Sequence, residues 1–147
     1  MKRIIEYRNL FNADKDTTLS ELKKTYRILV KEWHPDKFQE GDPKQGEAER
    51  KSKEIIDAYS FLVSISPETH TQNLEEYTET TTASGIEDYQ YKGVTLKVTF
   101  QNGSVYEYFG VPRNLYNKLN STPTLDRFAR RHIFHSHLYR KVMKSND

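Results

Sequence analysis

Three consecutive residues, His34, Pro35 and Asp36, bring together side chains that suit a protein–protein contact. Pro35 fixes its own φ angle and pushes His34 out of the α region, so a helix that reaches this point must end in a turn. Asp36 then offers a carboxylate on a rigid turn, where it is well placed to pair with a cationic side chain. The triplet is short, however, and would be a plain helix stop unless the neighbouring elements position it.

The residues before the triplet predict a helix over residues 19–33 with one apolar and one basic face. Thr18 and Glu21 form a capping box that starts this helix. The apolar residues recur at helical spacing and are Leu19, Leu22, Tyr26, Leu29 and Trp33. The basic residues of the opposite face are Lys23, Lys24, Arg27 and Lys31. This face is either an ordinary solvated surface or a means of attracting an acidic partner.

The residues after the triplet predict a polar loop and a second helix that pairs with the first. This helix begins near Asp42 or Gly46 and ends near Ser64. Its stripe consists of Ala48, Ser52, Ile55, Tyr59 and Leu62, in which Ser52 takes a position that favours an apolar residue. Two amphipathic helices joined by a loop are expected to pack antiparallel. A short helix over residues 4–11 precedes them.

Residues 4–65 resemble a J domain, the module of the DnaJ-like co-chaperones. The residues that carry the resemblance are Glu6-Tyr7, the Lys-Lys-Thr-Tyr run at 23–26, His34-Pro35-Asp36-Lys37, and the segment from Lys53-Glu54-Ile55 to Ala58-Tyr59. The resemblance implies that the His-Pro-Asp loop and the basic helix face bind a DnaK-type heat-shock chaperone ATPase and stimulate its ATP hydrolysis. The implied chaperone-binding residues are His34, Pro35, Asp36, Lys23, Tyr26, Arg27, Lys24 and Lys31.

The sequence departs from the family's pattern in three places. Ile28 stands where a further basic residue is common, Ser52 stands where an aromatic residue usually sits, and the loop between the two helices is longer than in many members. These differences bear on the strength of partner binding more than on its existence.

Residues 67–81 have the composition of an acidic linker. They are rich in Thr and Glu, and only Leu74 and Tyr77 are large and apolar. We therefore predict an extended, solvated segment, in which Leu74 to Thr78 could form a helical turn. Residues 112–147, in contrast, contain 8 basic and 2 acidic residues, which indicates a surface for an anionic partner.

The pattern changes to a period of two from Ile86 onwards. Leu96, Val98 and Phe100 alternate with polar residues, which predicts a half-buried strand. Asn102-Gly103 favours a two-residue type I′ hairpin turn, and residues 104–109 then form the returning strand. An earlier strand over residues 86–91 completes a three-stranded antiparallel meander.

The type I′ turn fixes the register of this hairpin. It places Leu96 opposite Phe109, Lys97 opposite Tyr108, Thr99 opposite Tyr106, and Phe100 opposite Val105. Tyr106 and Tyr108 then share a sheet face with Lys97, away from the apolar residues of the first strand.

Two helices are expected after the meander. Pro112 suits the first turn of a helix that ends near Asn120, and Thr124 can cap the last helix. The predicted buried side of this last helix consists of Leu125, Phe128, Ala129, His132 and Ile133. Its predicted exposed side consists of Arg127, Arg130, Arg131 and Phe134.

Residues 82–140 resemble a KTSC domain, a module also found at the end of some lysyl-tRNA synthetases. The residues that carry the resemblance are Leu96-Lys97-Val98-Thr99-Phe100, Asn102-Gly103, Tyr106-Glu107-Tyr108, Phe109-Gly110-Val111-Pro112 and Arg131-His132-Ile133. Thr124 and Asp126 depart from the family's Ser and Gly. The family's function is not settled, although nucleic-acid binding has been suggested for it.

The residues of this half allow RNA binding and also allow a purely structural alternative. Tyr106 and Tyr108, beside Lys97, could stack on bases while Arg127, Arg130 and Arg131 meet phosphates. The alternative is that both tyrosines are core residues beneath the helices and that the arginines form an ordinary solvated face.

Other kinds of chemistry find little support in the sequence. There is no cysteine, so thiolate chemistry is excluded, and His132, His135 and His137 have only Asp126 as a nearby acidic ligand. No nucleophilic triad, paired carboxylates or phosphate-binding glycine loop is recognisable, so we expect no enzyme, no cofactor and no metal. No apolar run is long enough to span a membrane.

The sequence therefore predicts two small domains: an all-α helical hairpin over residues 1–66 and an α+β domain over residues 82–147, joined by residues 67–81. The expected function is that of a cytoplasmic J-domain co-chaperone of a DnaK-type ATPase, with the C-terminal domain choosing a client or site. The alternative is an RNA- or tRNA-associated binding protein in which the J domain is incidental.

Overall fold

The computed structural model describes residues 1–142. The C-terminal domain was predicted to extend to residue 147, and residues 143–147 lie outside the described range. The chain divides into two compact units, one over Lys2–Thr71 and one that begins at Gln72. In the described part of the chain no helix is long and apolar enough to cross a membrane.

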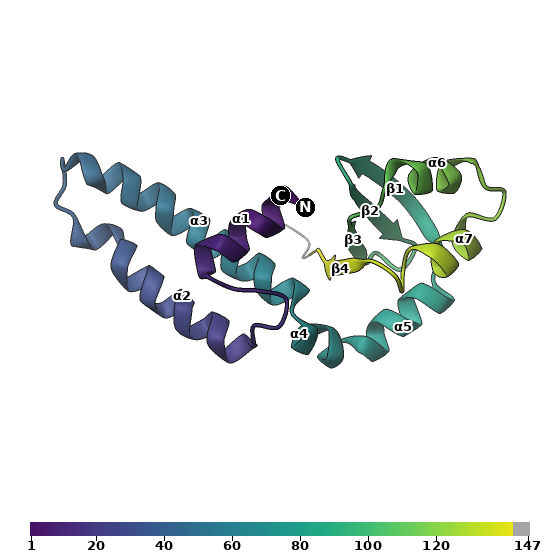
Figure 1. Cartoon of the computed structure of the whole chain (residues 1–147), viewed down its shortest axis with the longest axis horizontal. Coiled ribbons are helices and arrows are strands. Elements are labelled where there is room, and N and C mark those ends of the chain that lie inside the picture. Colours follow the sequence, from purple (N-terminus) through teal and green to yellow (C-terminus); the bar gives the residue numbers. More distant parts are fainter. Residues whose placement is uncertain (143–147) are drawn as a thin grey trace. The chain divides into compact units, whose positions relative to one another are not determined.

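The N-terminal unit is all helical, as predicted. Its elements are α1 (Lys2–Phe11), α2 (Leu19–Trp33), the 3₁₀ turn η1 (Pro35–Lys37), α3 (Pro43–Ile65) and α4 (Pro67–Gln72). The two long helices, α2 and α3, form an antiparallel hairpin with η1 in the loop that joins them (Figure 1). The bounds of α2 agree with the prediction, and α3 begins after an Asp42 cap whose side chain accepts from the N–H of Lys44.

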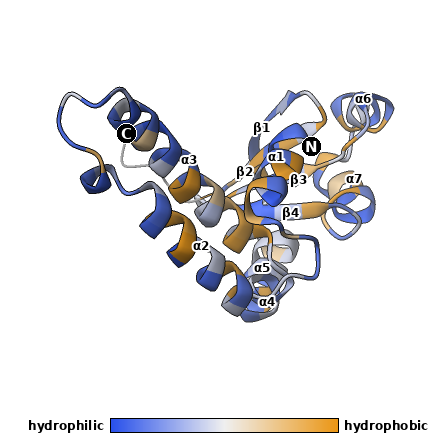
Figure 2. Cartoon of the chain, turned by 60° about the vertical axis from the view of Figure 1, so that its left-hand side comes forward, coloured by the Kyte–Doolittle hydropathy of each residue, from blue (hydrophilic) through white to orange (hydrophobic). Residues whose placement is uncertain are grey.

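The helical hairpin is held together by the apolar stripes that the sequence predicts. In Figure 2 hydrophobic and hydrophilic bands alternate along both long helices. Between them the ring of Tyr26 stacks on that of Tyr59, with centroids 4.2 Å apart. The buried side chains of this unit are Ile4, Phe11, Leu22, Ala48, Ile55, Ala58, Phe61, Leu62 and Ile65.

The prediction of an extended linker over residues 67–81 is wrong, because these residues form α4 and α5 (Leu74–Ala83). Tyr77, Thr80 and Thr81 recur at helical spacing and are buried. Composition concealed this face because two of its three members are threonines, which are polar residues, and the hydroxyl of Thr80 accepts from the side-chain amide of Asn102. The hydroxyl of Thr81 donates to the carbonyl of Tyr77 over 3.0 Å.

The C-terminal unit contains a four-stranded antiparallel sheet in the order β1-β2-β3-β4. The strands are β1 (Ile86–Lys92), β2 (Thr95–Phe100), β3 (Val105–Phe109) and β4 (Leu138–Lys141). The first three strands form the predicted meander. The fourth was not predicted, because a four-residue strand at the end of a chain shows little periodicity and depends on β3 for its partners.

The predicted register of the β2–β3 hairpin is wrong by one residue. Leu96 pairs with Tyr108 and Val98 with Tyr106. The loop has three residues rather than two, since the N–H of Phe100 donates to the carbonyl of Ser104 over 2.8 Å. Gly103, at φ +89°, is the only loop residue in the left-handed region, as in a type I turn followed by a bulge. A shift of one residue moves every side chain of a strand to the other face.

Helices cover one face of the sheet and complete the core. They are α5, α6 (Arg113–Ser121) and α7 (Leu125–His132). The core consists of Tyr77, Leu96, Val98, Phe100, Tyr106, Tyr108, Val111, Leu119, Ala129, Ile133 and Phe134. The predicted sides of the last helix are wrong at two positions, since His132 is exposed and Phe134 is buried. The helix ends at His132, so Phe134 does not follow its helical projection.

Candidate functional site

The His34-Pro35-Asp36 triplet forms a compact turn directly after α2. His34 has φ −60° and ψ 128°, the extended conformation that a following proline demands. Two backbone hydrogen bonds of 3.0 Å close the turn, from Lys37 N–H to the His34 carbonyl and from Phe38 N–H to the Pro35 carbonyl. The turn predicted at the end of the basic helix is therefore present, closed by backbone hydrogen bonds.

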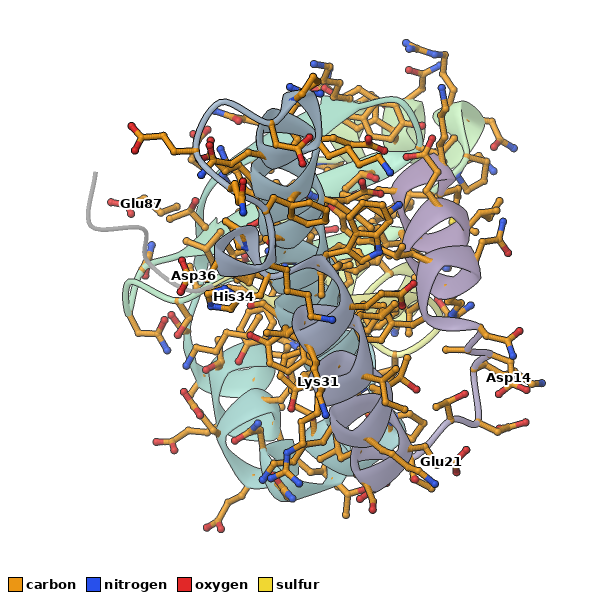
Figure 3. All side chains as sticks on the ribbon, turned by 90° about the vertical axis from the view of Figure 1, so that its left-hand side faces the viewer. Asp14, Glu21, Lys31, His34, Asp36 and Glu87 are labelled. Atoms are coloured by element: carbon orange, nitrogen blue, oxygen red, sulfur yellow. The ribbon has the colours of Figure 1, made fainter. Side chains whose placement is uncertain are left out.

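The side chains of His34 and Asp36 lie together on this turn (Figure 3). The Nδ1 atom of His34 accepts from the backbone N–H of Asp36 over 3.2 Å. The same Nδ1 lies 3.6 Å from the Asp36 carboxylate, whose side chain is 92% exposed. His34 therefore orients the backbone of the turn, while the carboxylate of Asp36 remains open to a cationic partner.

The predicted basic face of α2 is exposed. Lys23, Lys24, Arg27 and Lys31 all point to solvent. Lys31 lies in the last turn of α2, next to the His34-Pro35-Asp36 turn (Figure 3). In the described part of the chain none of the four forms an ion pair, so their charge is available to an acidic surface.

Tyr26 takes a different place from the lysines. Its half-buried ring stacks on Tyr59 of α3, so it belongs mainly to the packing between the two helices. A partner that lies along the basic face would meet its edge at most.

Two residues of α3, Ser52 and Lys51, contact the end of α2. Neither was predicted to belong to the site. The hydroxyl of Ser52 donates to the carbonyl oxygen of Trp33 over 2.8 Å. The ammonium of Lys51 lies 5.9 Å from the centre of the Trp33 ring. The only sequence feature that points to Ser52 is its polar side chain in an otherwise apolar stripe.

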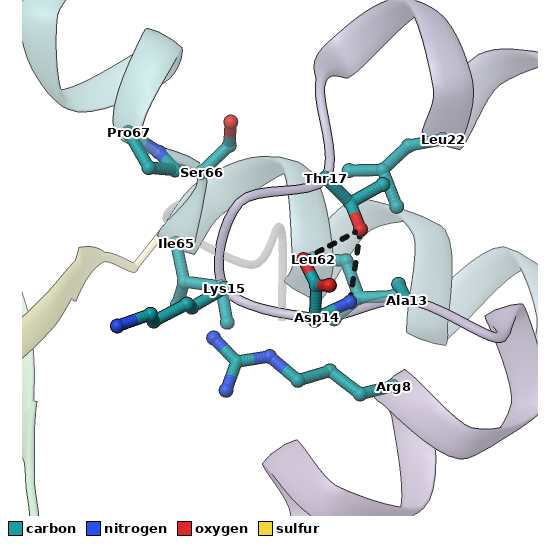
Figure 4. Close-up of a pocket in the computed structure, with 10 residues that line it drawn as sticks. All are labelled: Arg8, Ala13, Asp14, Lys15, Thr17, Leu22, Leu62, Ile65, Ser66 and Pro67. Carbon is teal, nitrogen blue, oxygen red and sulfur yellow. Dashed lines mark hydrogen bonds between the residues drawn. The ribbon is translucent and has the colours of Figure 1, made fainter.

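The opposite end of α2 is fixed by two caps. The Thr18 hydroxyl accepts from the N–H of Glu21 over 3.1 Å, as predicted, and Glu68 of α4 accepts from the N–H of Leu19 over 2.9 Å. Beside this end lies a small pocket (Figure 4). Its lining includes Asp14, whose carboxylate accepts from the Thr17 hydroxyl, and the pocket is distant in sequence from the His34 turn.

Of the two alternatives for the tyrosines of the C-terminal unit, the RNA-stacking surface is not formed. Tyr106 and Tyr108 are 2% and 0% exposed, and they lie on the covered face of the sheet. Lys97 is exposed and points to the other face. The register shift is the physical reason: the structural alternative, in which both tyrosines are core residues, describes their position.

The three predicted phosphate-binding arginines do not act as one group. Arg127 and Arg131 are exposed on α7. Arg130 instead donates from Nε to the carbonyl of Thr81 over 3.1 Å, so it caps the end of α5. Arg130 is itself exposed, but this bond engages its guanidinium. Lys97 lies on the opposite face of the sheet from α7, so it does not form one site with the arginines.

The histidines of the C-terminal unit are spread over different surroundings. His132 packs against Phe128, His135 lies edge-on to Tyr77, and His137 lies 3.3 Å from the Ile133 carbonyl through Nδ1. Among residues 1–142 no group of three potential metal ligands is brought together.

The most perturbed side chains of the described residues are tyrosines of the C-terminal core. Burial raises the pKa of Tyr106 to about 12. Burial also raises the pKa of Tyr77 and of Tyr108 well above the ordinary value, and their hydroxyls lie 3.0 Å apart. These shifts arise from desolvation in a packed core and stabilise the neutral phenols.

Comparison with known proteins assigns both units. The DnaJ domain family matches residues 6–70, and the KTSC domain family matches residues 83–137. The chain is 42% identical over 57 residues to the chaperone protein DnaJ of Thermotoga petrophila, and 46% identical over 57 residues to that of Thermoplasma acidophilum. It is 36% identical over 59 residues to DnaJ homolog subfamily B member 6 of Xenopus tropicalis.

These similarities are confined to the N-terminal part of the chain. They cover 39–40% of this chain, but only 15% of each DnaJ protein and 23% of the Xenopus protein. The chain thus spans less than a quarter of the length of these relatives. The helical hairpin with its His34-Pro35-Asp36 turn and the helix-covered sheet agree with the two matched families, and the chain accordingly consists of a DnaJ domain followed by a KTSC domain.

Proposed function

We propose that this protein is a J-domain co-chaperone that recruits a DnaK-type ATPase and stimulates its ATP hydrolysis. The observation that carries the proposal is the exposed carboxylate of Asp36 on a turn that Pro35 and His34 hold rigid. A preorganised turn loses little conformational entropy on binding, so its charge can be used for the contact itself.

The two parts of the surface have different roles in this proposal. Lys23, Lys24, Arg27 and Lys31 attract an acidic surface of the chaperone and raise the rate of encounter. Asp36 then pairs with a cationic group of the chaperone in the docked complex. In this proposal the chemistry of ATP hydrolysis belongs to the chaperone.

The KTSC domain gives the co-chaperone its target in this proposal. It exposes Arg127 and Arg131 on α7, a basic pair that suits an acidic client or another anionic partner, while Lys97 is exposed on the opposite face of the sheet. The site of action that we propose is the cytoplasm, where DnaK-type chaperones have ATP.

A single-turnover ATPase measurement tests the proposal. The full chain is added to a DnaK-type chaperone, and wild type is compared with Asp36→Asn and with Asp57→Asn. Asp57 is an exposed acid on α3, outside the turn, so it makes the same change of charge elsewhere.

Wild type and Asp57→Asn are expected to stimulate hydrolysis equally, and Asp36→Asn is expected to abolish the stimulation. Absence of stimulation by wild type, or equal stimulation by all three proteins, would overturn the proposal.

A further inference from the structure

Ser52 makes a contact between helices that the hydroxyls of Thr71, Thr82 and Ser121 do not make. Its half-buried hydroxyl donates to the Trp33 carbonyl, which lies on α2 and 19 residues earlier in the sequence. The hydroxyls of Thr71, Thr82 and Ser121 donate instead to the carbonyl four residues earlier in their own helix. Such back-bonding is the usual choice of a hydroxyl inside a helix. The Ser52 hydroxyl instead donates to a carbonyl on α2.

Among residues 1–142, Ser52 is the donor recorded for the Trp33 carbonyl, and the backbone that follows Trp33 offers it none. The last carbonyl groups of an α-helix have no partner within the helix. The N–H of Lys37, four residues on, donates to the carbonyl of His34 instead. Pro35 has no N–H to offer. The hydrogen bond from Ser52 therefore satisfies the final carbonyl of α2.

The same turn of α3 also holds the side chain of Trp33. The Lys51 ammonium lies over the indole ring, at 5.9 Å from its centre. Trp33 is thus fixed through its ring and through its carbonyl, and its carbonyl is joined by one peptide bond to His34. His34 in turn positions Asp36 through the hydrogen bond from the Asp36 N–H to Nδ1.

We propose that Ser52 is a positioning residue for the His34-Pro35-Asp36 turn. Through Trp33 it fixes the direction in which the chain leaves α2, and with it the direction of the Asp36 carboxylate. In this protein a hydrogen bond performs the task, at a position where an aromatic residue is usual. The functional part of the inference rests on the proposed ATPase stimulation, whereas the ordering of the turn does not.

Three substitutions on α3 test the proposal in the full chain. Ser52→Ala removes the hydroxyl, Ser52→Thr keeps it, and Ser60→Ala makes the same change at an exposed position of the same helix. Each protein is titrated against the chaperone ATPase to obtain the half-maximal concentration and the maximal stimulation separately.

Ser52→Ala is expected to raise the half-maximal concentration about fivefold, the typical value of one hydrogen bond, while the maximal stimulation stays close to wild type. The half-maximal concentration is expected to change and the maximal stimulation is not, because a less ordered turn still reaches the docked geometry. It loses more conformational entropy on binding, however, which weakens the affinity. Ser52→Thr is expected to restore the wild-type value, and Ser60→Ala to leave it unchanged.

A spectroscopic measurement observes the turn without the chaperone. Trp33 is the only tryptophan of the chain, so its carbonyl carbon can be labelled selectively for NMR. Loss of the hydrogen bond is expected to shift this resonance in Ser52→Ala but not in Ser60→Ala. The amides of Asp36 and Phe38 are expected to exchange faster with solvent in the same variant.

The possible results separate this inference from the proposed function. If wild type stimulates the ATPase and Asp36→Asn does not, but Ser52→Ala matches wild type in affinity and in the Trp33 resonance, Ser52 has no positioning role. If wild type fails to stimulate, the proposed function falls, and the resonance and exchange data alone decide whether Ser52 orders the turn. If Ser52→Thr behaves like Ser52→Ala, the hydroxyl is not the group that acts.

Discussion

The hydroxyl of Tyr77 donates a hydrogen bond of 2.6 Å to the carbonyl oxygen of Phe134, 57 residues further along the chain. The ring of Tyr77 also stacks on Tyr139, with centroids 3.9 Å apart. Tyr77 thus joins α5 to the segment between α7 and β4 and to β4 itself. Helix α5 precedes the region that matches the KTSC family, yet it contributes a central residue to the core of that unit.

Substitution Tyr77→Phe is expected to destabilise the C-terminal unit by about 1–3 kcal/mol. The change keeps the stacked ring but leaves the buried carbonyl of Phe134 and the hydroxyl of Tyr108 without their partner. The measurement is urea unfolding of the full chain, followed by the NMR signal of the Val98 amide in β2.

Tyr89→Phe is the matched control for this substitution. The Tyr89 hydroxyl donates to Asn120 at an exposed site, so its loss is expected to cost less than about 0.5 kcal/mol. Equal effects of the two substitutions would show that the buried hydroxyl network does not stabilise this unit.

The same tyrosine cluster predicts alkaline unfolding of the C-terminal unit. Burial raises the pKa of Tyr106 from 10.0 to about 12, and that of Tyr77 and Tyr108 also rises. The folded state therefore binds protons that the unfolded state releases. The resulting stability is fully present below pH 10 and is lost as the pH rises from about 10 towards 12.

The ultraviolet absorbance of tyrosinate, recorded together with the Val98 amide signal, checks this prediction. Buried tyrosines are expected to ionise only as the amide signal disappears, and Tyr106→Phe is expected to weaken the pH dependence. Ionisation of all tyrosines near pH 10 in a unit that remains folded would contradict it.

The parts of the fold that local chemistry determines could be predicted from the sequence. Thr18 and Pro35 act on their immediate neighbours, so both ends of α2 and the turn after it were found at the residues expected. The first three strands and the Gly103 turn were also found, whereas β4 was not. The register of the β2–β3 hairpin was not found either, because Asn102-Gly103 is compatible with both a two-residue and a three-residue loop, and packing against the helices decides between them.

The parts that depend on distant partners could not be predicted. α5 has a composition typical of a linker, and its helical structure depends on Tyr77 and on the cap that Arg130 provides. Likewise, the sequence alone shows Ser52 only as a polar residue in an apolar stripe. Its role depends on the Trp33 carbonyl, to which its hydroxyl donates. In both cases a polar group gains its role from a residue that is far away in the sequence.

Removal of the N-terminal cap of α2 by Thr18→Ala is expected to destabilise the DnaJ domain by about 1 kcal/mol. The substitution leaves the N–H of Glu21 without its acceptor. Trp33 fluorescence during urea unfolding reports this unit alone, because no other tryptophan is present. Ser20→Ala, an exposed change in the first turn of α2, is expected to have almost no effect, and a similar loss in both variants would argue against the cap.

The C-terminal surface is expected to bind single-stranded RNA weakly or not at all. Base stacking needs exposed aromatic rings, and both Tyr106 and Tyr108 are buried. Titration of the full chain with mixed RNA oligomers at two salt concentrations measures this. Tight binding that weakens steeply with salt, and that Arg127→Gln and Arg131→Gln together abolish, would restore the RNA interpretation.

The basic face of α2 is expected to act mainly on the encounter with the chaperone. The double substitution Arg27→Gln and Lys31→Gln should raise the half-maximal concentration for ATPase stimulation, and should make it less sensitive to salt, because surface charges steer association through a field that ions screen. The control is Arg50→Gln with Lys53→Gln, which removes two exposed charges from α3 and leaves α2 intact. Stopped-flow association at low and high salt distinguishes the two pairs of substitutions.

If both pairs slow association equally, net charge rather than the α2 face governs the encounter. If neither does, the lysines and arginine of α2 are only a solvated surface, and Asp36 with its turn must supply the specificity of the contact without them.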